Sequence, residues 1–333
     1  MMGLYYEKLF DKDKDSSQNL FLKMCTGYVS YFSGGNPVNF PAKRIINMYH
    51  SMSDIQLQEN LNDLYNETVT KPPQENNDAQ EFKDKDEKAK SYYVKTRQSA
   101  NIASIDELLK SNWNELRLQK INGRGKLTGF YTALGKYSKK FQNIIAHINY
   151  SDNDKEKDKE KYKILIYSDL LKSGCHVIAK LLELLGYQQY KGDKTLSSPG
   201  KRYALWTGET KNTEMIQSEF NRRDNDNGDY IQIMIGSTSI MEGVSFKSVR
   251  EVHILNPWWN DSRIYQVIAR AVRFGSHNSL PLEKRYVNIF RHYSIYDKYP
   301  ENDPRYLFDH PAYLDLRKNK RLDFSEKVKD MSN

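Results

Sequence analysis

Three polar side chains in residues 266–273 could bind an anion. Gln266, Arg270 and Arg273 are spaced i, i+4 and i+7, so they share one face if this segment is a helix. Guanidinium groups are planar, permanently charged donors that suit phosphate oxygens. A helix that faces a nucleotide bound elsewhere could use them to stabilise charge during phosphoryl transfer. A surface helix with ordinary charges has the same spacing, so this segment alone leaves both interpretations open.

A second candidate is the segment GSTSIMEGVSF, residues 236–246, which directly follows an apolar run. Small hydroxylated residues and free backbone N–H groups at the start of a helix favour phosphate binding. Thr238 is well placed to touch the phosphate of a nucleic-acid backbone. Gly243 allows a tight turn or the close approach of a ligand. An ordinary strand-to-helix loop has a similar composition, so this segment is also ambiguous by itself.

The elements that must position these residues are short apolar strands that alternate with helices. A helix from about 262 to 274, capped by Asn260 or Asp261, carries the two arginines. The pattern predicts an α/β fold, a parallel sheet with helices on both faces. Ligands of such sheets bind at the carboxyl ends of the strands, so the loops after Tyr167, Ile235 and Leu255 matter most. The predicted strands are residues 43–48, 163–167, 203–206, 231–235, 252–255 and 286–290.

Residues 1–155 are predicted to form a separate, largely helical segment with an edge strand. A polar insertion at about 55–92 is expected to be solvated. Ser104 and Glu107 have the spacing of a capping box at a helix start. Basic helices follow over 115–148, and a charge run over 151–161 reads as a loop or linker. The strand–helix domain itself is expected over 156–310, with a polar tail over 311–333.

The basic helices carry aromatic residues between their cations, which has two explanations. Such a pattern can track a phosphate backbone and stack bases. It also describes amphipathic helices with buried aromatics and solvated lysines. Trp258 and Trp259 pose the same choice between core anchor and stacking contact, and we expect the core for both. The residues concerned are Arg117, Lys120, Arg124, Lys126, Lys136, Lys139 and Lys140, with Phe130, Tyr131, Tyr137 and Phe141.

The charge of the chain indicates its kind of partner, and its cysteine content indicates its kind of compartment. The formal net charge of +8 favours an anionic partner, nucleic acid before an anionic membrane, although a merely lysine-rich chain has the same balance. The two cysteines, Cys25 and Cys175, form no metal or disulfide pattern, and the histidines are scattered. No metal site is expected, and a reducing compartment fits. The sequence shows neither a signal peptide nor a stretch that would span a membrane.

The two candidate segments together, in this order and separated by a strand, resemble motifs V and VI of superfamily 2 helicases. Motif V corresponds to GSTSIMEGVSF and motif VI to QVIARAVRFGSH. The chain is most similar to helicase-like ATPases of large cytoplasmic DNA viruses, such as poxvirus nucleoside triphosphatase I and the early transcription factor ATPase. Softer resemblances upstream include KILIYSDLLKSGCHVIAKLLELLGY and YALWTGET, so the similarity runs from about residue 25 to 293.

The resemblance implies a RecA-like C-terminal motor domain that works on nucleic acid, DNA foremost, with ATP and Mg²⁺. Arg270 and Arg273 would reach the γ-phosphate, and Gln266 would help at the same interface. Glu242 and Gly243 would lie near the nucleotide. A viral RNA polymerase is an implied partner, and the host cytoplasm or the virion the implied location.

The resemblance also implies that Ser168, Ser237 and Thr238 contact the backbone of a nucleic-acid strand. Two positions depart from the family pattern. Ala269 replaces the usual glycine before the first motif VI arginine, a change that preserves a small side chain. Ser245 stands where many members have an acidic residue, which puts a ribose contact there in doubt.

A complete motor also needs a phosphate-binding loop and an acidic pair for Mg²⁺. Residues 123–128 offer a Gly-Lys pair but lack Ser or Thr directly after the lysine, and Asp106-Glu107 is better explained by the capping box. The chain alone is therefore expected not to hydrolyse ATP. It would need an N-terminal RecA-like domain in cis or in trans, as a fragment or split-gene product. The alternative is a degenerate, non-hydrolysing module that binds nucleic acid or a polymerase.

Overall fold

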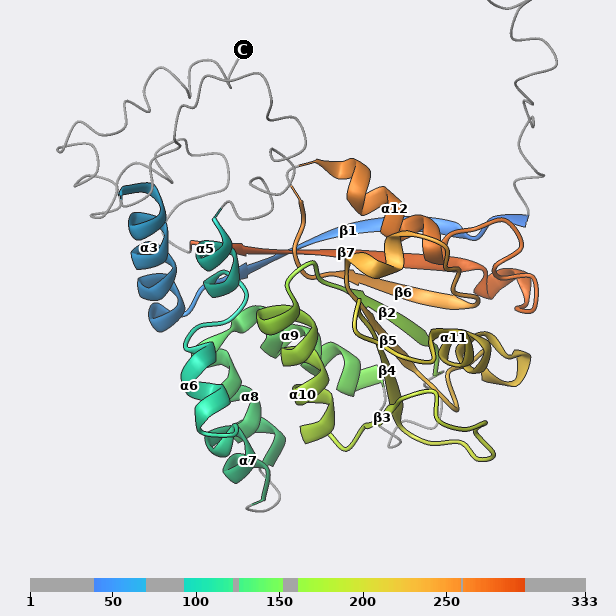
Figure 1. The fold of residues 1–333 in the computed structure, drawn as a ribbon, viewed down its shortest axis with the longest axis horizontal. Helices are drawn as coiled ribbons and strands as arrows, with labels where there is room; N and C mark the ends of the chain where they lie inside the picture. Colours follow the sequence, from blue (N-terminus) through green and yellow to red (C-terminus); the bar gives the residue numbers. More distant parts are fainter. Residues whose placement is uncertain (1–38, 70–92, 122–125, 152–160, 259, 297–333) are drawn as a thin grey trace, which may run out of the picture. The chain divides into compact units, whose positions relative to one another are not determined.

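The computed structural model describes residues 39–69, 93–121, 126–151, 161–258 and 260–296. Their centre is a seven-stranded sheet in the order β1-β7-β6-β2-β5-β4-β3, in which every pair is parallel (Figure 1). The strands are β1 (Ala42–Ser51), β2 (Lys163–Tyr167), β3 (Gln188–Tyr190), β4 (Arg202–Trp206), β5 (Ile233–Gly236), β6 (Val249–Ile254) and β7 (Tyr286–Ile295).

Helices cover both faces of this sheet, which explains why its central strands are continuous apolar runs. Every residue of β2 and β5 is buried, and alternate side chains enter different cores. Ile164 and Ile166 face the core shared with α9 and α10, whereas Leu165 and Tyr167 face the core shared with α11 and α12. The predicted fold class, a parallel sheet with helices on both faces and a largely helical additional region, is confirmed.

One face carries the helices that precede and follow β2, and the other carries those that follow β4 and β6 (Figure 1). The first group is α6 (Ile105–Lys110), α7 (Asn114–Ile121), α8 (Lys126–Tyr137), α9 (Lys139–Ser151), a π-turn at Leu171–Cys175 and α10 (His176–Leu184). The second group is α11 (Thr213–Asn221), the 3-10 turn η4 (Thr238–Met241) and α12 (Asp261–Ala271). Two further helices are α3 (Asp54–Val69) and α5 (Val94–Ser99).

A boundary was predicted at residue 155, but the residues on its two sides share one sheet and one hydrophobic core. Strand β1 pairs with β7 along its whole length, and Phe141 and Ile145 of α9 lie in the same core as Ile164 of β2. The charge run that suggested a linker begins in the last turn of α9, and residues 152–160 lie outside the described part. The predicted edge strand is therefore present, but as a member of the main sheet.

Two local predictions also need correction. The polar insertion expected at about 55–92 begins with helix α3, which buries Gln56, Asn60 and Leu61, while residues 70–92 lie outside the described part. The capping box does not form, because the backbone N–H of Ser104 donates to Glu59 instead of Glu107. The sequence did not predict α3 because buried amide side chains have the same sequence pattern as solvated ones.

Candidate functional site

The loop after β5 is shaped by its own small residues. A Cβ atom at Gly236 would lie 2.6 Å from Cδ1 of Ile240, so a side chain at this position would displace Ile240 of the turn η4. Ser237 is buried at the start of this turn, and its hydroxyl accepts a hydrogen bond from the N–H of Ser239. Thr238 is exposed. Gly243 adopts a left-handed conformation with a φ of 69°, as the expected tight turn requires.

Helix α12 begins at a side-chain cap and buries one apolar face. The Oδ1 atom of Asn260 accepts from the N–H of Ser262 at 2.8 Å, which confirms one of the two predicted caps. Gln266 is exposed, and Arg270 lies at the edge of the buried face. The helix ends at Ala271, earlier than predicted, so Arg273 follows the helix and does not share its face. The buried side chains are Ile264, Val267, Ile268 and Ala271.

Both arginines reach the loop after β5 despite this shorter helix. Arg270 donates to the carbonyl oxygens of Met241 and, at 3.3 Å, of Val244. Arg273 donates to the hydroxyl of Ser245. The structure therefore brings together motifs V and VI, as the resemblance implied, and Ser245 holds an arginine where the family has an acidic residue.

The acceptors of these two guanidinium groups are neutral. Within the described part of the chain, neither Arg270 nor Arg273 forms an ion pair with a carboxylate. Burial lowers the pKa of Arg270, the charge of Arg273 lowers it further, and the charge of exposed Glu242 opposes both. The buried Nε atom of Arg270 also has no hydrogen-bond partner among these residues. Two positive charges thus stand close together, and neither forms an ion pair within the described residues, an arrangement that suits an anion.

Ser168 does not have the position that the resemblance implied. Its side chain is fully buried, and its hydroxyl oxygen lies 2.6 Å from Oδ1 of Asn256 and 3.0 Å from the carbonyl of Leu170. A Cβ atom at Gly174 would come within 2.0 Å of this hydroxyl oxygen. Ser168 therefore joins the polar core, and the prediction that it contacts a nucleic-acid strand is wrong. Ser237 is likewise too buried for that contact, which leaves Thr238.

The helices α7–α9 are amphipathic helices with buried aromatic residues more than a surface for nucleic acid. Phe130 and Phe141 are buried in the core, and Lys136 is exposed and paired with Glu115. Lys140 is an exception, because its amino group is buried and donates to Asn101 and to the carbonyl of Leu255. Burial lowers the pKa of Lys140 to about 7. The candidate phosphate loop at 123–128 lies outside the residues whose side chains are described.

Trp258 is half-buried against the core on the α12 side of the sheet, and two cations contact its ring. The guanidinium carbons of Arg97 and Arg263 are 4.5 Å and 4.6 Å from the centroid of its ring. Arg97 also pairs with Asp169, directly after β2. Trp258 therefore lies at the edge of the core, as expected in part, and also contacts the two arginines, whereas Trp259 lies outside the described residues.

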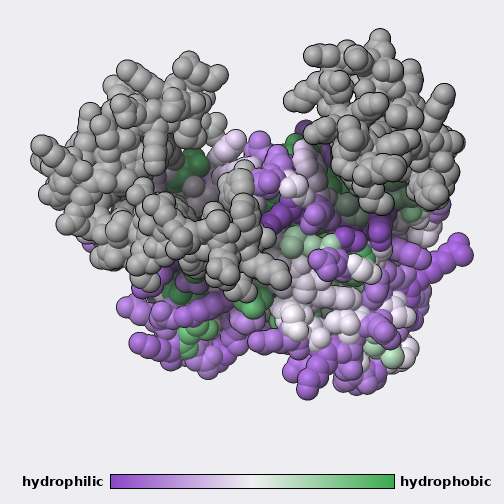
Figure 2. Space-filling view, turned by 45° about the horizontal axis from the view of Figure 1, so that its top comes forward, coloured by the Kyte–Doolittle hydropathy of each residue, from purple (hydrophilic) through white to green (hydrophobic). Residues whose placement is uncertain are grey.

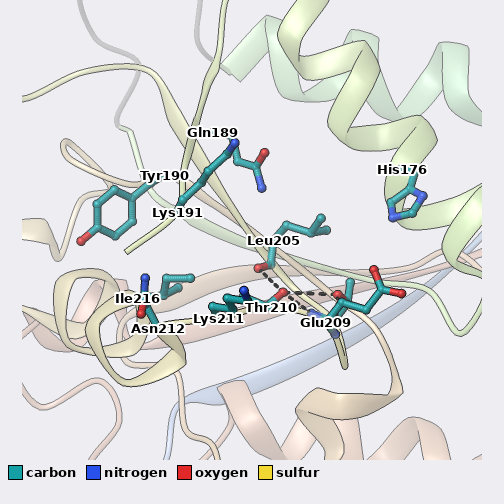
Figure 3. A pocket seen from close by; sticks show the side chains of 11 residues that line it. His176, Gln189, Tyr190, Lys191, Leu205, Glu209, Thr210, Lys211, Asn212 and Ile216 are labelled. Carbon is teal, nitrogen blue, oxygen red and sulfur yellow. Dashed lines mark hydrogen bonds between the residues drawn. The ribbon is translucent and has the colours of Figure 1, made fainter. Parts of the chain in front are cut away.

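A pocket opens at the carboxyl ends of β3 and β4 (Figure 3). Its volume is about 400 Å³, and none of its lining residues belongs to motif V or VI. The turn after β4 is held by Thr210, whose hydroxyl donates to the carbonyl of Leu205 at 3.0 Å and accepts from the N–H of Thr207 at 2.9 Å. Lys191 and Lys211 add two cations, Glu209 an anion, and His176 an imidazole from α10.

Four histidines and Glu251 form a cluster that the sequence did not predict. The imidazoles of His50, His292 and His253, from β1, β7 and β6, are linked in series by contacts of 2.9 Å and 3.0 Å. His253 and His147 of α9 both approach Glu251. Burial would raise the pKa of Glu251, but its hydrogen bonds with the two imidazoles lower it to about 2. Histidines spaced far apart in the sequence gave no signal for this cluster.

The central part of the chain matches a known protein family. Residues 139–275 match the family model of the helicase conserved C-terminal domain. A protein of Acanthamoeba polyphaga mimivirus, named as an ATP-dependent RNA helicase, is 29% identical over 298 residues, which cover 84% of this chain and 45% of that protein. A protein of African swine fever virus, named as a termination factor NPH-I homolog, is 34% identical over 166 residues, 40% of this chain and 24% of that protein.

A solved structure was also matched, the Sulfolobus solfataricus SWI2/SNF2 ATPase core in complex with dsDNA. Its TM-score is 0.44 at 15% identity, with 85% of this chain and 48% of that chain covered. The chain spans less than half the length of the viral relatives described above. No helix among the described residues combines the length and apolar character needed to cross a bilayer.

Proposed function

We propose that this chain, whose residues 139–275 match the helicase conserved C-terminal domain and belong to a RecA-like α/β fold, supplies the C-terminal half of an ATP-dependent nucleic-acid motor. ATP and Mg²⁺ would be bound mainly by an N-terminal RecA-like domain with a phosphate-binding loop, in cis or in trans. The observation that carries the proposal is the pair Arg270 and Arg273, which among the described residues donate only to neutral acceptors in the loop after β5.

In this proposal the two arginines act across the interface with the nucleotide. Their present acceptors are two carbonyls and a hydroxyl, which are weaker partners than the charged oxygens of a triphosphate. When the two motor domains close, Arg270 and Arg273 exchange these acceptors for the γ-phosphate and stabilise its developing charge. Gln266 stands exposed on the same helix, and Glu242 and Gly243 lie exposed in the loop, where they can contact the nucleotide.

Nucleic acid, with DNA as the favoured substrate, would bind along the carboxyl edge of the sheet. Thr238 is exposed there, and Lys191 and Lys211 line the pocket after β3 and β4. Hydrophilic side chains cover much of the described surface visible in Figure 2, and the formal net charge of +8 favours a polyanion. Opening and closing of the two domains would then move Thr238 relative to the strand.

The viral relatives support a more specific role. Because one of them is named as a termination factor homolog, we propose that the chain serves viral transcription beside a viral RNA polymerase. The host cytoplasm or the virion would be its place of action. The relative from mimivirus is named as an RNA helicase, so the choice between DNA and RNA must be tested directly.

The deciding experiment is an ATPase assay of the chain alone and mixed with the product of the gene immediately upstream. Each sample is measured without nucleic acid, with double-stranded DNA and with RNA. Activity confined to the mixture, and stimulated more by DNA, is the expected result. Salt-sensitive DNA binding without turnover in every mixture would instead support the degenerate, non-hydrolysing module.

A further inference from the structure

We propose that His147, Glu251 and His253 bind a divalent transition-metal ion, with Zn²⁺ as the best fit. Glu251 and His253 are two residues apart on β6, so their side chains leave the strand on the same face. His147 approaches them from α9, which covers that face. The three donor atoms all lie within 4.8 Å of one another.

The separations of these atoms match metal ligands better than ion pairs. Nε2 of His147 lies 3.2 Å from Oε2 of Glu251, and Nε2 of His253 lies 3.4 Å from the same oxygen. Hydrogen bonds between charged nitrogen and oxygen are shorter, roughly 2.7–2.9 Å. Two ligands about 2.0–2.1 Å from a tetrahedral Zn²⁺ are roughly 3.3 Å apart. The two distances from the imidazole nitrogens to the carboxylate are therefore those that a shared ion requires.

The donor set indicates which ions would bind. Two imidazole nitrogens and one carboxylate are ligands of Zn²⁺ and of other first-row transition metals. Mg²⁺ and Ca²⁺ prefer sites made of oxygen atoms, so they fit poorly. The side chain of His147 is 43% exposed, whereas those of Glu251 and His253 are 6% and 1% exposed. The ion can therefore enter from the side of α9 and keep a water molecule as its fourth ligand.

The surroundings orient the ligands as an outer shell of a metal site does. Nδ1 of His253 lies 3.0 Å from Nε2 of His292, and Nδ1 of His292 lies 2.9 Å from Nε2 of His50. Tyr162 donates a hydrogen bond to Oε1 of Glu251 at 2.9 Å. A metal on Nε2 of His253 requires the proton on Nδ1, and His292 is placed to accept it.

The protons of this imidazole series can rearrange when a metal binds, because the residue at the far end of the series can change its role. The last contact joins Nδ1 of His50 to the side-chain amide of Asn143, at 3.0 Å. Asn143 is exposed on α9, so its amide can turn and present oxygen instead of nitrogen. Each ring can then carry its proton on Nδ1, which leaves Nε2 of His253 free for the ion. The site would fasten α9 to β6 on the face of the sheet opposite α12.

The test uses the untagged full chain after treatment with EDTA. Binding of Zn²⁺ is measured by competition with a chromogenic chelator, and Co²⁺ is used as a visible probe of tetrahedral coordination. His147→Gln is the informative variant, because this exposed side chain can be replaced without opening the core. His176→Gln is the matched control, since His176 is also an exposed helical histidine but lies outside the cluster.

We expect one Zn²⁺ per chain for the unaltered protein and for His176→Gln. The His147→Gln chain should bind more than roughly 100-fold less tightly, because loss of a direct ligand exceeds the effect of losing an outer-shell partner. Added Zn²⁺ should raise the melting temperature of the unaltered chain and not that of His147→Gln. Equal affinity in these two chains, or no stoichiometric binding by the unaltered chain, would overturn the proposal and leave an ion pair without metal.

Discussion

The hydroxyl oxygen of Ser168 lies 2.6 Å from Oδ1 of Asn256, in a site closed to solvent. Asn256 in turn donates to Asn101 at 2.8 Å, and Asn101 accepts from Lys140 at 2.9 Å. The carboxyl ends of β2 and β6 are thus joined by a buried polar network. Ser168 belongs to this network, whereas Thr238 is exposed, although the sequence predicted the same role for both residues.

We predict that Ser168→Ala lowers stability and that Thr238→Ala weakens DNA binding. Ser168→Ala should lower the free energy of unfolding by about 1–3 kcal/mol, because Asn256 loses a buried partner, and should leave DNA affinity unchanged. Thr238→Ala should weaken DNA binding and change stability by less than about 0.5 kcal/mol, because its side chain is exposed. Urea unfolding and fluorescence anisotropy with labelled DNA measure the two quantities. A loss of DNA affinity in Ser168→Ala at full folding would contradict the assignment.

Removal of Arg273 should abolish turnover of the assembled motor. Arg273→Ala is expected to lower kcat by at least roughly 1000-fold, the effect of losing an arginine that stabilises the transferred phosphoryl group. Arg223→Ala serves as control, because Arg223 is an exposed arginine outside both motifs. Ser245→Ala removes the present partner of Arg273 and should keep most of the activity. If Ser245→Ala is as inactive as Arg273→Ala, Arg273 holds the loop and does not act on phosphate.

Lys191 and Lys211 should contribute to the salt dependence of DNA binding. A lysine that neutralises one phosphate adds about 0.9 to the slope of log affinity against log salt concentration. Lys191→Ala and Lys211→Ala should each reduce this slope by about 1. Lys180→Ala is the matched control, because the amino group of Lys180 lies 2.9 Å from Glu183 and is already paired. The slopes are measured from DNA titrations at several salt concentrations. Equal slopes for all three variants and the unaltered chain would show that the pocket lysines do not bind DNA.

Stability should fall in mild acid through buried histidines. Burial lowers the pKa of His277 from 6.5 to about 4, although its hydrogen bond to the carbonyl of Val249 opposes this. Below pH 6.5 the unfolded chain therefore binds a proton that the folded chain resists, and the free energy of unfolding decreases as the pH falls toward 4. Each such histidine adds up to about 1.4 kcal/mol per pH unit to the slope.

His277→Gln isolates this contribution, because glutamine cannot take up the proton. Urea unfolding between pH 7 and pH 4.5 should show a shallower decline for His277→Gln than for the unaltered chain. His147 does not confuse the comparison: its hydrogen bond to Glu251 raises its pKa, so its own contribution changes only above 6.5. Parallel pH profiles of the two chains would show that His277 is accessible to protons in the folded state.

The sequence by itself determined six of the seven described strands and the two motifs. Strands β2 and β5 are covered on both faces, so they appear as largely apolar runs, and small loop residues mark the turn after β5. The sequence also placed residues 236–246 and 266–273 after strands of one parallel sheet, and the structure adds the contact between them. Strand β3 and helix α11 escaped prediction, since three residues and a mostly polar nonapeptide carry little periodic signal.

Only the tertiary structure decided which polar residues near those motifs are accessible. Ser168 and Thr238 both follow a strand, but the chain packs Gly174 against the first and leaves the second in solvent. The histidine cluster arises from His50, His147, His253 and His292, which come from four elements whose pairing the sequence does not specify. Burial and proximity depend on how distant segments pack, and this information is not contained in the spacing of residues along the chain.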